Sequence, residues 1–175
     1  TNINENKITV IHNGLEKHWN SSNNYINNNN ILYVGNMKEH KNVILLIKAF
    51  NCINNANNIK LYLVGNMNNN LDKKIISLIH GNENIILIDY VNKKQLLDYY
   101  NSARLFVFPS NYEGFGFTPL EAMACGCPVI ATNTASIPEV CCDGALYYEK
   151  NNLDDLVNKI SLLINNTDIC DDLVK

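Results

Sequence analysis

The sequence has no long hydrophobic run and no concentration of charge of one sign. Its longest apolar stretches have the length of a β-strand, so no segment is predicted to cross a membrane. The formal net charge of −3 is spread over both signs, which argues against a nucleic-acid-binding stripe and a polybasic membrane-binding helix. Hydrophobic residues make up 46% of the 175 residues, so the composition predicts one folded domain with its own core.

Disulfide patterning and metal-ligand spacing are also missing. The six cysteines are scattered along the chain, which favours a reducing compartment and predicts a cytoplasmic protein. Cys125 and Cys127 are separated by one residue, and Cys141 and Cys142 are adjacent, so neither pair has the gap or the histidine partners of a zinc site. We therefore expect no metal and no cofactor. The many asparagines cluster between periodic segments and are interpreted as loop residues.

Segments of strand length alternate with segments of helical periodicity. This alternation implies crossover connections and predicts an α/β domain with a Rossmann-like doubly wound parallel sheet, whose strands are apolar because helices cover both faces. The predicted strands are 7–11, 30–35, 59–65, 84–91, 104–110 and 128–131, and the predicted helices are 42–53, 71–80, 93–103, about 118–125 and 153–164.

In such sheets ligands bind beyond the carboxyl ends of the strands, next to helix N-termini. One rim of the domain is therefore predicted to carry residues 35–42, 65–70, 89–93 and 109–118. No G-x-G-x-x-G follows the first strand and no G-x-x-x-x-G-K-[ST] occurs, so a dehydrogenase and a P-loop protein have little support.

The stretch NYEGFGFTPLEAMACGCPVIAT (111–132) is the densest in unusual residues. Gly114 and Gly116 allow positive φ and close approach of a ligand, and Thr118 is a predicted N-cap of a helix whose positive end suits a phosphate. Glu113 would then suit sugar hydroxyls or a developing oxocarbenium ion. Two plainer interpretations stay open: Glu113 as an exposed loop acid, and Glu121 as the partner of Thr118 in a capping box.

The spacing from Glu113 to Glu121 reads E-x7-E with Gly-Phe-Gly after the first glutamate. Together with EAMACGCPVIAT, it resembles the donor-site motif of retaining GT-B glycosyltransferases of the family-four kind, many of which are mannosyltransferases. The resemblance extends over nearly the whole chain. It includes VIHNGL (10–15), YVGNMKEHKNVILLIKAF (33–50), DYVNKKQLLDYYNSARLFVFPSNYEGFGF (89–117), SIPEV (136–140) and GALYYEKNN (144–152).

The resemblance implies a site for a nucleoside diphosphate sugar, with GDP-mannose favoured, and retaining hexosyl transfer. Lys41 would hold the diphosphate, Gly35 would leave space for it and Glu113 would lie beside the hexose, so Glu113 and Lys41 are the predicted catalytic residues. The resemblance implies further donor-binding residues. The backbone near Tyr90 and Val91 would border the nucleobase, with Leu96 beneath it, and Glu121 would bind the ribose. The amides of Gly114, Phe115 and Gly116 would contact the sugar hydroxyls, and those of Phe117 and Thr118 the phosphates.

Asn36 departs from the family pattern. Many relatives carry arginine at this position of the donor site, so either a phosphate-binding charge is missing or Lys38 or His40 substitutes for it. Lys41 itself could be no more than a solvated lysine at a helix start. No Asp-x-Asp occurs, so the metal-dependent donor site of the other glycosyltransferase architecture is not expected.

The resemblance also implies that donor and acceptor are bound by different domains. Residues 1–175 are expected to be a single nucleotide-sugar-binding domain, with an N-terminal acceptor domain and a terminal crossover helix outside this chain. The domain alone is expected not to turn over, and the full-length protein is compatible with peripheral membrane association. The alternative is a non-catalytic nucleotide-sugar-binding module or subunit.

Overall fold

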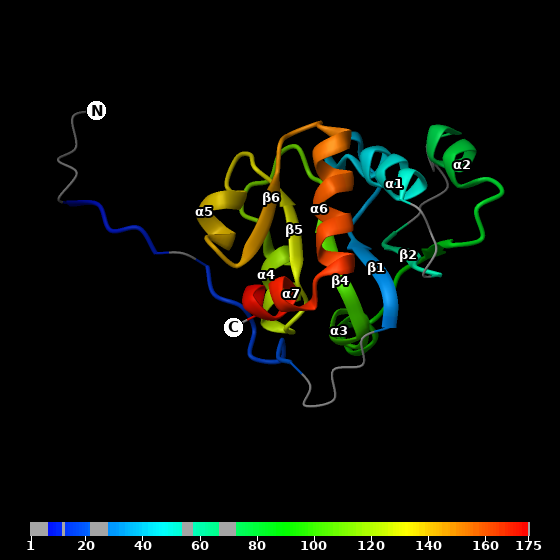
Figure 1. Ribbon diagram of the computed structural model, residues 1–175. Helices are drawn as coiled ribbons and strands as arrows, with labels where there is room; N and C mark the ends of the chain where they lie inside the picture. The colour runs from blue at the N-terminus through cyan, green and yellow to red at the C-terminus, as the bar shows by residue number, and fades with distance from the viewer. Residues whose placement is uncertain (1–6, 12, 22–27, 54–57, 67–72, 175) are drawn as a thin grey trace.

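The protein forms one parallel sheet between two layers of helices (Figure 1). The computed structural model describes residues 7–11, 13–21, 28–53, 58–66 and 73–174. The six strands have the order β3-β2-β1-β4-β5-β6 and all neighbours are parallel, which confirms the predicted doubly wound α/β fold. The strands are β1 (Asn28–Val34), β2 (Lys60–Val64), β3 (Ile85–Ile88), β4 (Ala103–Phe108), β5 (Val129–Thr132) and β6 (Ala145–Tyr148).

Helices cover both faces of the sheet. Ile31 and Tyr33 of β1 join the core of one face, whereas Leu32 joins the core of the other, because successive side chains of a strand point to opposite faces. All three are fully buried, which explains why the strands are apolar at nearly every position. One face carries α1 (Val43–Cys52), α2 (Lys73–Ile79), α6 (Leu153–Asn165) and α7 (Thr167–Leu173), and the other carries α3 (Lys93–Ser102), α4 (Phe117–Ala124) and α5 (Ile137–Cys141).

The order of the strands creates a switch point in the middle of the sheet. β1 and β4 are neighbours, although β2 and β3 lie between them in the sequence. The loops that leave the carboxyl ends of β1 and β4 therefore turn to opposite sides and leave a crevice, the usual ligand position in such sheets. The loop after β1 contains a short 3-10 helix, η2 (Glu39–Lys41), and the loop after β4 leads into α4.

The strand predicted at 7–11 is wrong, since these residues form no strand and lie away from the sheet in Figure 1. Ile8, Val10 and Ile11 are 58%, 72% and 86% exposed. Their β-branched side chains suit a strand, but a strand needs a neighbouring ladder and an apolar surface, and the described structure supplies neither.

Other differences concern short elements. The predicted elements do not include α5, β6 and α7, because each has seven residues or fewer and periodicity alone cannot identify so short an element. The remaining predicted helices and strands are present, with ends that differ by a few residues. Residues 71–72 of the predicted helix 71–80, and much of the predicted rim 65–70, lie outside the described residues. No helix in the described ranges is long and apolar enough to span a membrane.

Candidate active site

Lys41 and Glu113 meet at the switch point. The Lys41 Nζ atom lies 2.6 Å from Glu113 Oε1, although the two residues are 72 positions apart. Their side chains are only 15% and 16% exposed, so the ion pair is screened far less by water than a surface pair. Nζ also lies 5.7 Å from the centre of the Phe108 ring, within cation–π range. The structure thus joins the two predicted catalytic residues, and Glu113 is not an ordinary exposed loop acid.

Backbone and amide contacts hold the two loops together. The Asn111 N–H donates to the carbonyl oxygen of His40 at 2.7 Å, directly beside Lys41. The side-chain amide of Asn42 donates to Asn111 Oδ1 at 3.4 Å and to Asn151 Oδ1 at 3.1 Å. Asn42 has a φ of 53°, a left-handed conformation that asparagine tolerates better than most residues. These contacts position Lys41 and Glu113 before any ligand arrives.

Two serines that the sequence analysis did not single out also support the loop after β4. The Ser110 hydroxyl lies 2.5 Å from Glu113 Oε1. The Ser136 hydroxyl lies 3.1 Å from the carbonyl oxygen of Glu113 and 2.9 Å from that of Phe115, and its one proton can serve either. Ser136 precedes α5 and lies in the SIPEV segment, so the family resemblance was the only sequence signal for it.

α4 begins at Phe117, one residue before the predicted start. Gly116 is its N-cap residue with a φ of 112°, and an added Cβ would lie 2.9 Å from Ile137 Cδ1. Glycine is therefore required both by the backbone conformation and by the space available. An added Cβ on Gly114 would meet nothing within 4 Å, and Gly114 is not among the positive-φ residues. The space around the Cα atom of Gly114, next to Glu113 in the loop, is therefore open.

The prediction of Thr118 as N-cap is wrong, and so is the alternative interpretation of Glu121 as its capping-box partner. Thr118 is the second residue of α4 and not its N-cap, and no side chain caps this helix. The first amides of α4, including those of Phe117 and Thr118, thus lack a side-chain cap and suit an anion at the positive end of the helix. Phe117 is 45% exposed, and its ring centre lies 4.9 Å from that of Phe115.

Glu121 has a structural partner on the neighbouring helix. Its Oε2 accepts a hydrogen bond of 3.1 Å from the hydroxyl of Tyr100, a fully buried residue of α3. Burial raises the pKa of the Glu121 carboxyl, while the Tyr100 hydrogen bond and the His18 charge oppose this shift. The Trp19 ring stands edge-on to Tyr100 at 5.7 Å. Glu121 therefore faces α3 and the N-terminal segment rather than capping its own helix.

Gly35 is required by packing at the carboxyl end of β1. An added Cβ would lie 2.7 Å from the Tyr33 hydroxyl, which donates a 2.6 Å hydrogen bond to the carbonyl oxygen of Asn36. Burial, reinforced by the charge of Glu113, raises the pKa of Tyr33 well above its usual range, so its hydroxyl stays protonated. Asn36, Lys38 and His40 lie further out on this loop, and Asn36 Oδ1 accepts from the Lys38 N–H at 3.2 Å.

The residues predicted at the nucleobase lie on the same rim but further out. Tyr90 is 80% exposed and Val91 is half-buried, both in the loop that follows β3. Leu96 is half-buried on α3 and contributes to the core beneath that loop. Because β3 is the edge strand, two strands from β1, this group lies apart from the Lys41–Glu113 pair.

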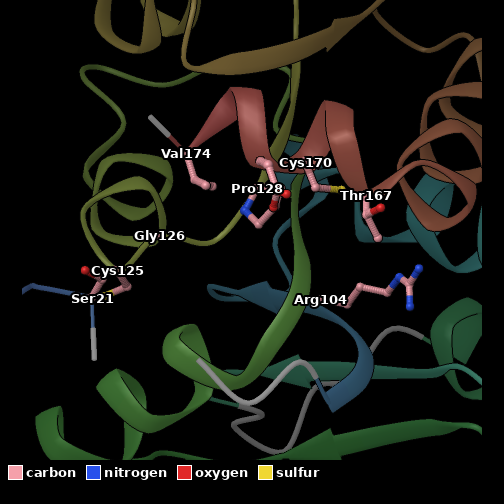
Figure 2. A pocket seen from close by; sticks show the side chains of 9 residues that line it. Ser21, Arg104, Cys125, Gly126, Pro128, Thr167, Cys170 and Val174 are labelled. Carbon is pink, nitrogen blue, oxygen red and sulfur yellow. The ribbon is translucent and has the colours of Figure 1, made fainter. Parts of the chain in front are cut away.

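Among the cavities formed by the described residues, two bear on where the site lies. One of about 390 Å³ adjoins the start of α1, next to Asn42 and Asn111. The other, of about 320 Å³, lies at the amino ends of β4 and β5 (Figure 2). It contains none of the predicted site residues, so we place the functional site at the carboxyl ends. Its lining includes Ser21, Arg104, Cys125, Pro128 and Cys170. Among the described residues, no three His, Cys, Asp or Glu side chains are grouped to hold a metal ion.

The structure thus combines a doubly wound parallel sheet, a glycine N-cap on α4 and a Lys41–Glu113 pair at the switch point. The chain belongs to the family Glycosyl transferases group 1, which matches residues 16–175. Its fold is the one seen in the solved C-terminal domain of a glycosyl transferase group 1 family protein.

Two of the relatives with similar sequences are named as glycosyltransferases. The chain is 31% identical over 183 residues to the capsular polysaccharide biosynthesis glycosyltransferase CapM of Staphylococcus aureus, covering 92% of this chain and 47% of CapM. It is 34% identical to the O-antigen chain mannosyltransferase B of Escherichia coli, covering 70% of this chain and 33% of that protein. The chain thus spans less than half the length of these two relatives.

Solved structures show the same fold. The C-terminal domain of a glycosyl transferase group 1 family protein (LpcC) from Francisella tularensis superposes with a TM-score of 0.82 at 20% identity, covering 93% of each chain. A point mutant of TarM from S. aureus, in a complex that includes UDP, gives a TM-score of 0.81 at 23% identity, covering 99% of this chain and 35% of TarM.

Proposed function

We propose that this domain binds a nucleoside diphosphate sugar, with GDP-mannose favoured, for retaining transfer of a hexosyl group. The observation that carries the proposal is the Lys41–Glu113 pair of 2.6 Å at the switch point, beside the uncapped start of α4. A cation and a helix N-terminus suit a diphosphate, and a carboxylate suits sugar hydroxyls.

The proposed roles follow from the arrangement of charges. Lys41 and the amides of Phe117 and Thr118 bind the diphosphate and stabilise the negative charge that develops on it as it departs. Glu113 lies beside the hexose, where its carboxylate favours hydroxyls and the positive charge of an oxocarbenium-like transition state. The open space above Gly114 leaves room for the sugar.

Further donor contacts complete the proposal. Glu121 accepts hydrogen bonds from the ribose, and the backbone near Tyr90 and Val91 borders the nucleobase. Gly35 leaves room for the diphosphate, Phe115 and Gly116 provide amides to the sugar, and Asn36 occupies the position that carries arginine in many relatives.

The choice of GDP-mannose rests on the relatives. One of them is a mannosyltransferase of E. coli that is 34% identical over 127 residues. Serotype-specific mannosyltransferase WbdA, also of E. coli, is 46% identical over 56 residues. The geometry of the site itself does not depend on which sugar and which base the donor carries.

We infer that the acceptor is bound by a second domain and that transfer requires closure of the two domains over the donor. This chain would then bind donor without turning it over. A cytoplasmic location agrees with the six cysteines, which are all free thiols.

A ligand panel tests the proposed function. We expect GDP and GDP-mannose to raise the melting temperature of the 175-residue chain more than UDP, UDP-glucose or GMP at equal concentration. A ligand at 100 times its dissociation constant adds about 2.7 kcal/mol, which corresponds to a shift of roughly 5–10 °C for a domain of this size. If no nucleoside diphosphate or sugar nucleotide shifted the transition at millimolar concentration, the proposal would be wrong.

A non-catalytic nucleotide-sugar-binding module is the second candidate, because Asn36 replaces the arginine of many relatives. In a longer protein that transfers sugar, Glu113→Ala should abolish transfer and leave binding of the nucleoside diphosphate largely intact. Equal loss of transfer and binding, or loss of neither, would favour the binding module.

A further inference from the structure

Ser110 makes the shortest contact to the Glu113 carboxylate. Its hydroxyl lies 2.5 Å from Glu113 Oε1 and 3.3 Å from the carbonyl oxygen of His40. A hydroxyl has one proton, and the charged and closer acceptor is favoured, so Ser110 donates to Glu113. Ser110 is only 1% exposed and lies two residues beyond Phe108, the last residue of β4. The Ser110 hydroxyl is therefore a buried donor, held where the loop leaves the sheet.

The two oxygens of Glu113 have different surroundings. Within the described part of the chain, Lys41 and Ser110 both reach Oε1, and no hydrogen bond reaches Oε2. Oε1 is thus occupied by two donors, whereas Oε2 keeps its capacity to accept hydrogen bonds. The protein can therefore hold the Glu113 carboxylate through Oε1 while Oε2 accepts hydrogen bonds from a ligand.

Lys41 cannot hold Glu113 alone when a diphosphate is bound. Its ammonium group has three N–H donors, and within the described chain it makes one hydrogen bond, to Glu113 Oε1. A diphosphate carries more negative charge than Glu113 and competes for these donors. As Lys41 turns to the phosphates, Ser110 is the contact that keeps Oε1 in place.

We propose that Ser110 is a positioning residue, which holds Glu113 so that its Oε2 faces the donor sugar. This inference rests on the proposed function, since it concerns the same site. It predicts a separation of roles: Ser110 contributes to binding of the sugar but not of the nucleoside diphosphate, whereas Lys41 contributes to both.

Titration calorimetry of the 175-residue chain with GDP and GDP-mannose tests this separation, with UDP and UDP-glucose as the second ligand pair. Ser110→Ala should change the affinity for the nucleoside diphosphate by less than about twofold. The ratio of sugar-nucleotide affinity to nucleoside-diphosphate affinity should fall about tenfold, as expected for loss of one charge-assisted hydrogen bond. Ser110→Thr, which keeps the hydroxyl, should retain the ratio.

The substitution is expected to fold, because it leaves no buried acceptor without a donor. The His40 carbonyl keeps its hydrogen bond from the Asn111 N–H, and Glu113 keeps Lys41. Ser77→Ala is the matched control, since Ser77 is exposed on α2 and its hydroxyl donates only within its own helix, to the Lys74 carbonyl. Thermal unfolding of each variant verifies folding before titration.

The outcomes separate this inference from the proposed function. If the wild-type chain bound neither ligand pair, both would be overturned. If the wild-type chain bound both members of a pair and Ser110→Ala left the ratio unchanged, or weakened both equally, only the role of Ser110 would be overturned.

Discussion

Replacing Lys41 by methionine removes the cation opposite Glu113 and keeps an unbranched apolar stem. Two unit charges about 4 Å apart attract by about 4 kcal/mol at an effective dielectric constant of about 20, and desolvation offsets most of this attraction. The larger effect is on the partner left behind. Glu113 is 16% exposed and, among the described residues, would keep only the Ser110 hydroxyl as a side-chain donor. We therefore expect Lys41→Met to lower the free energy of unfolding by about 1–3 kcal/mol.

A double-mutant cycle separates the stranded charge from the loss of packing. Adding Glu113→Gln to Lys41→Met replaces the unpaired carboxylate by a neutral amide, so the double variant should be more stable than Lys41→Met alone. Urea unfolding followed by circular dichroism measures all four proteins. Strictly additive losses would show that the 2.6 Å contact contributes no coupling between the two residues.

The same variant tests the assignment of Lys41 to the diphosphate. Loss of a charge-assisted contact of about 1.5–3 kcal/mol should weaken GDP binding by roughly 10-fold to 150-fold in calorimetry. Lys48→Met is the matched control, because Lys48 is exposed on the outer side of α1 and should change neither affinity nor stability by much. Wild-type GDP affinity in Lys41→Met would remove Lys41 from the phosphate site.

Two further substitutions probe the start of α4 and the carboxylate on it. Gly116→Ala should lower the free energy of unfolding by about 1–3 kcal/mol, because its φ of 112° and the 2.9 Å approach to Ile137 Cδ1 both oppose a Cβ. Gly114→Ala should change stability little, and comparable losses in the two variants would contradict this explanation. Tyr100→Phe removes a hydrogen bond that lowers the already raised pKa of Glu121, so that pKa should rise further in a carboxyl NMR titration. A carboxyl group whose pKa is raised in the folded state contributes stability at pH values below its usual pKa, and this contribution is lost as pH rises through the folded-state pKa. The contribution of Glu121 should therefore be lost at higher pH in Tyr100→Phe than in wild type. An unchanged titration would contradict the Tyr100 contact.

The fold was predictable because it depends on local patterns repeated along the chain. Strands buried on both faces must be apolar throughout, and their alternation with helical periodicity implies parallel crossover connections. Boundaries and short elements were less accessible. The segment 7–11 has strand-forming residues without a neighbouring strand, while β6 has only four residues and pairs with β5 at the sheet edge. Whether each segment forms a strand depends on whether a neighbouring strand is available to pair with it, which periodicity does not reveal.

The candidate site was predictable in part. The E-x7-E spacing and the family resemblance pointed to Lys41 and Glu113, but Ser110, Ser136 and Tyr100 carry no motif of their own. Their contacts join loops or helices that are distant in the sequence. The roles of the predicted residues in donor binding stay predictions until a ligand is titrated.

The order of residues along the chain was sufficient to specify an α/β domain and the loops in which its charged residues lie. It was not sufficient to specify which loops become neighbours. β1 and β4 adjoin across two intervening strands, and this arrangement places Lys41 2.6 Å from Glu113. The physical reason is that hydrophobic periodicity acts between near neighbours, whereas the adjacency of strands emerges from packing the whole sheet between its two helical layers.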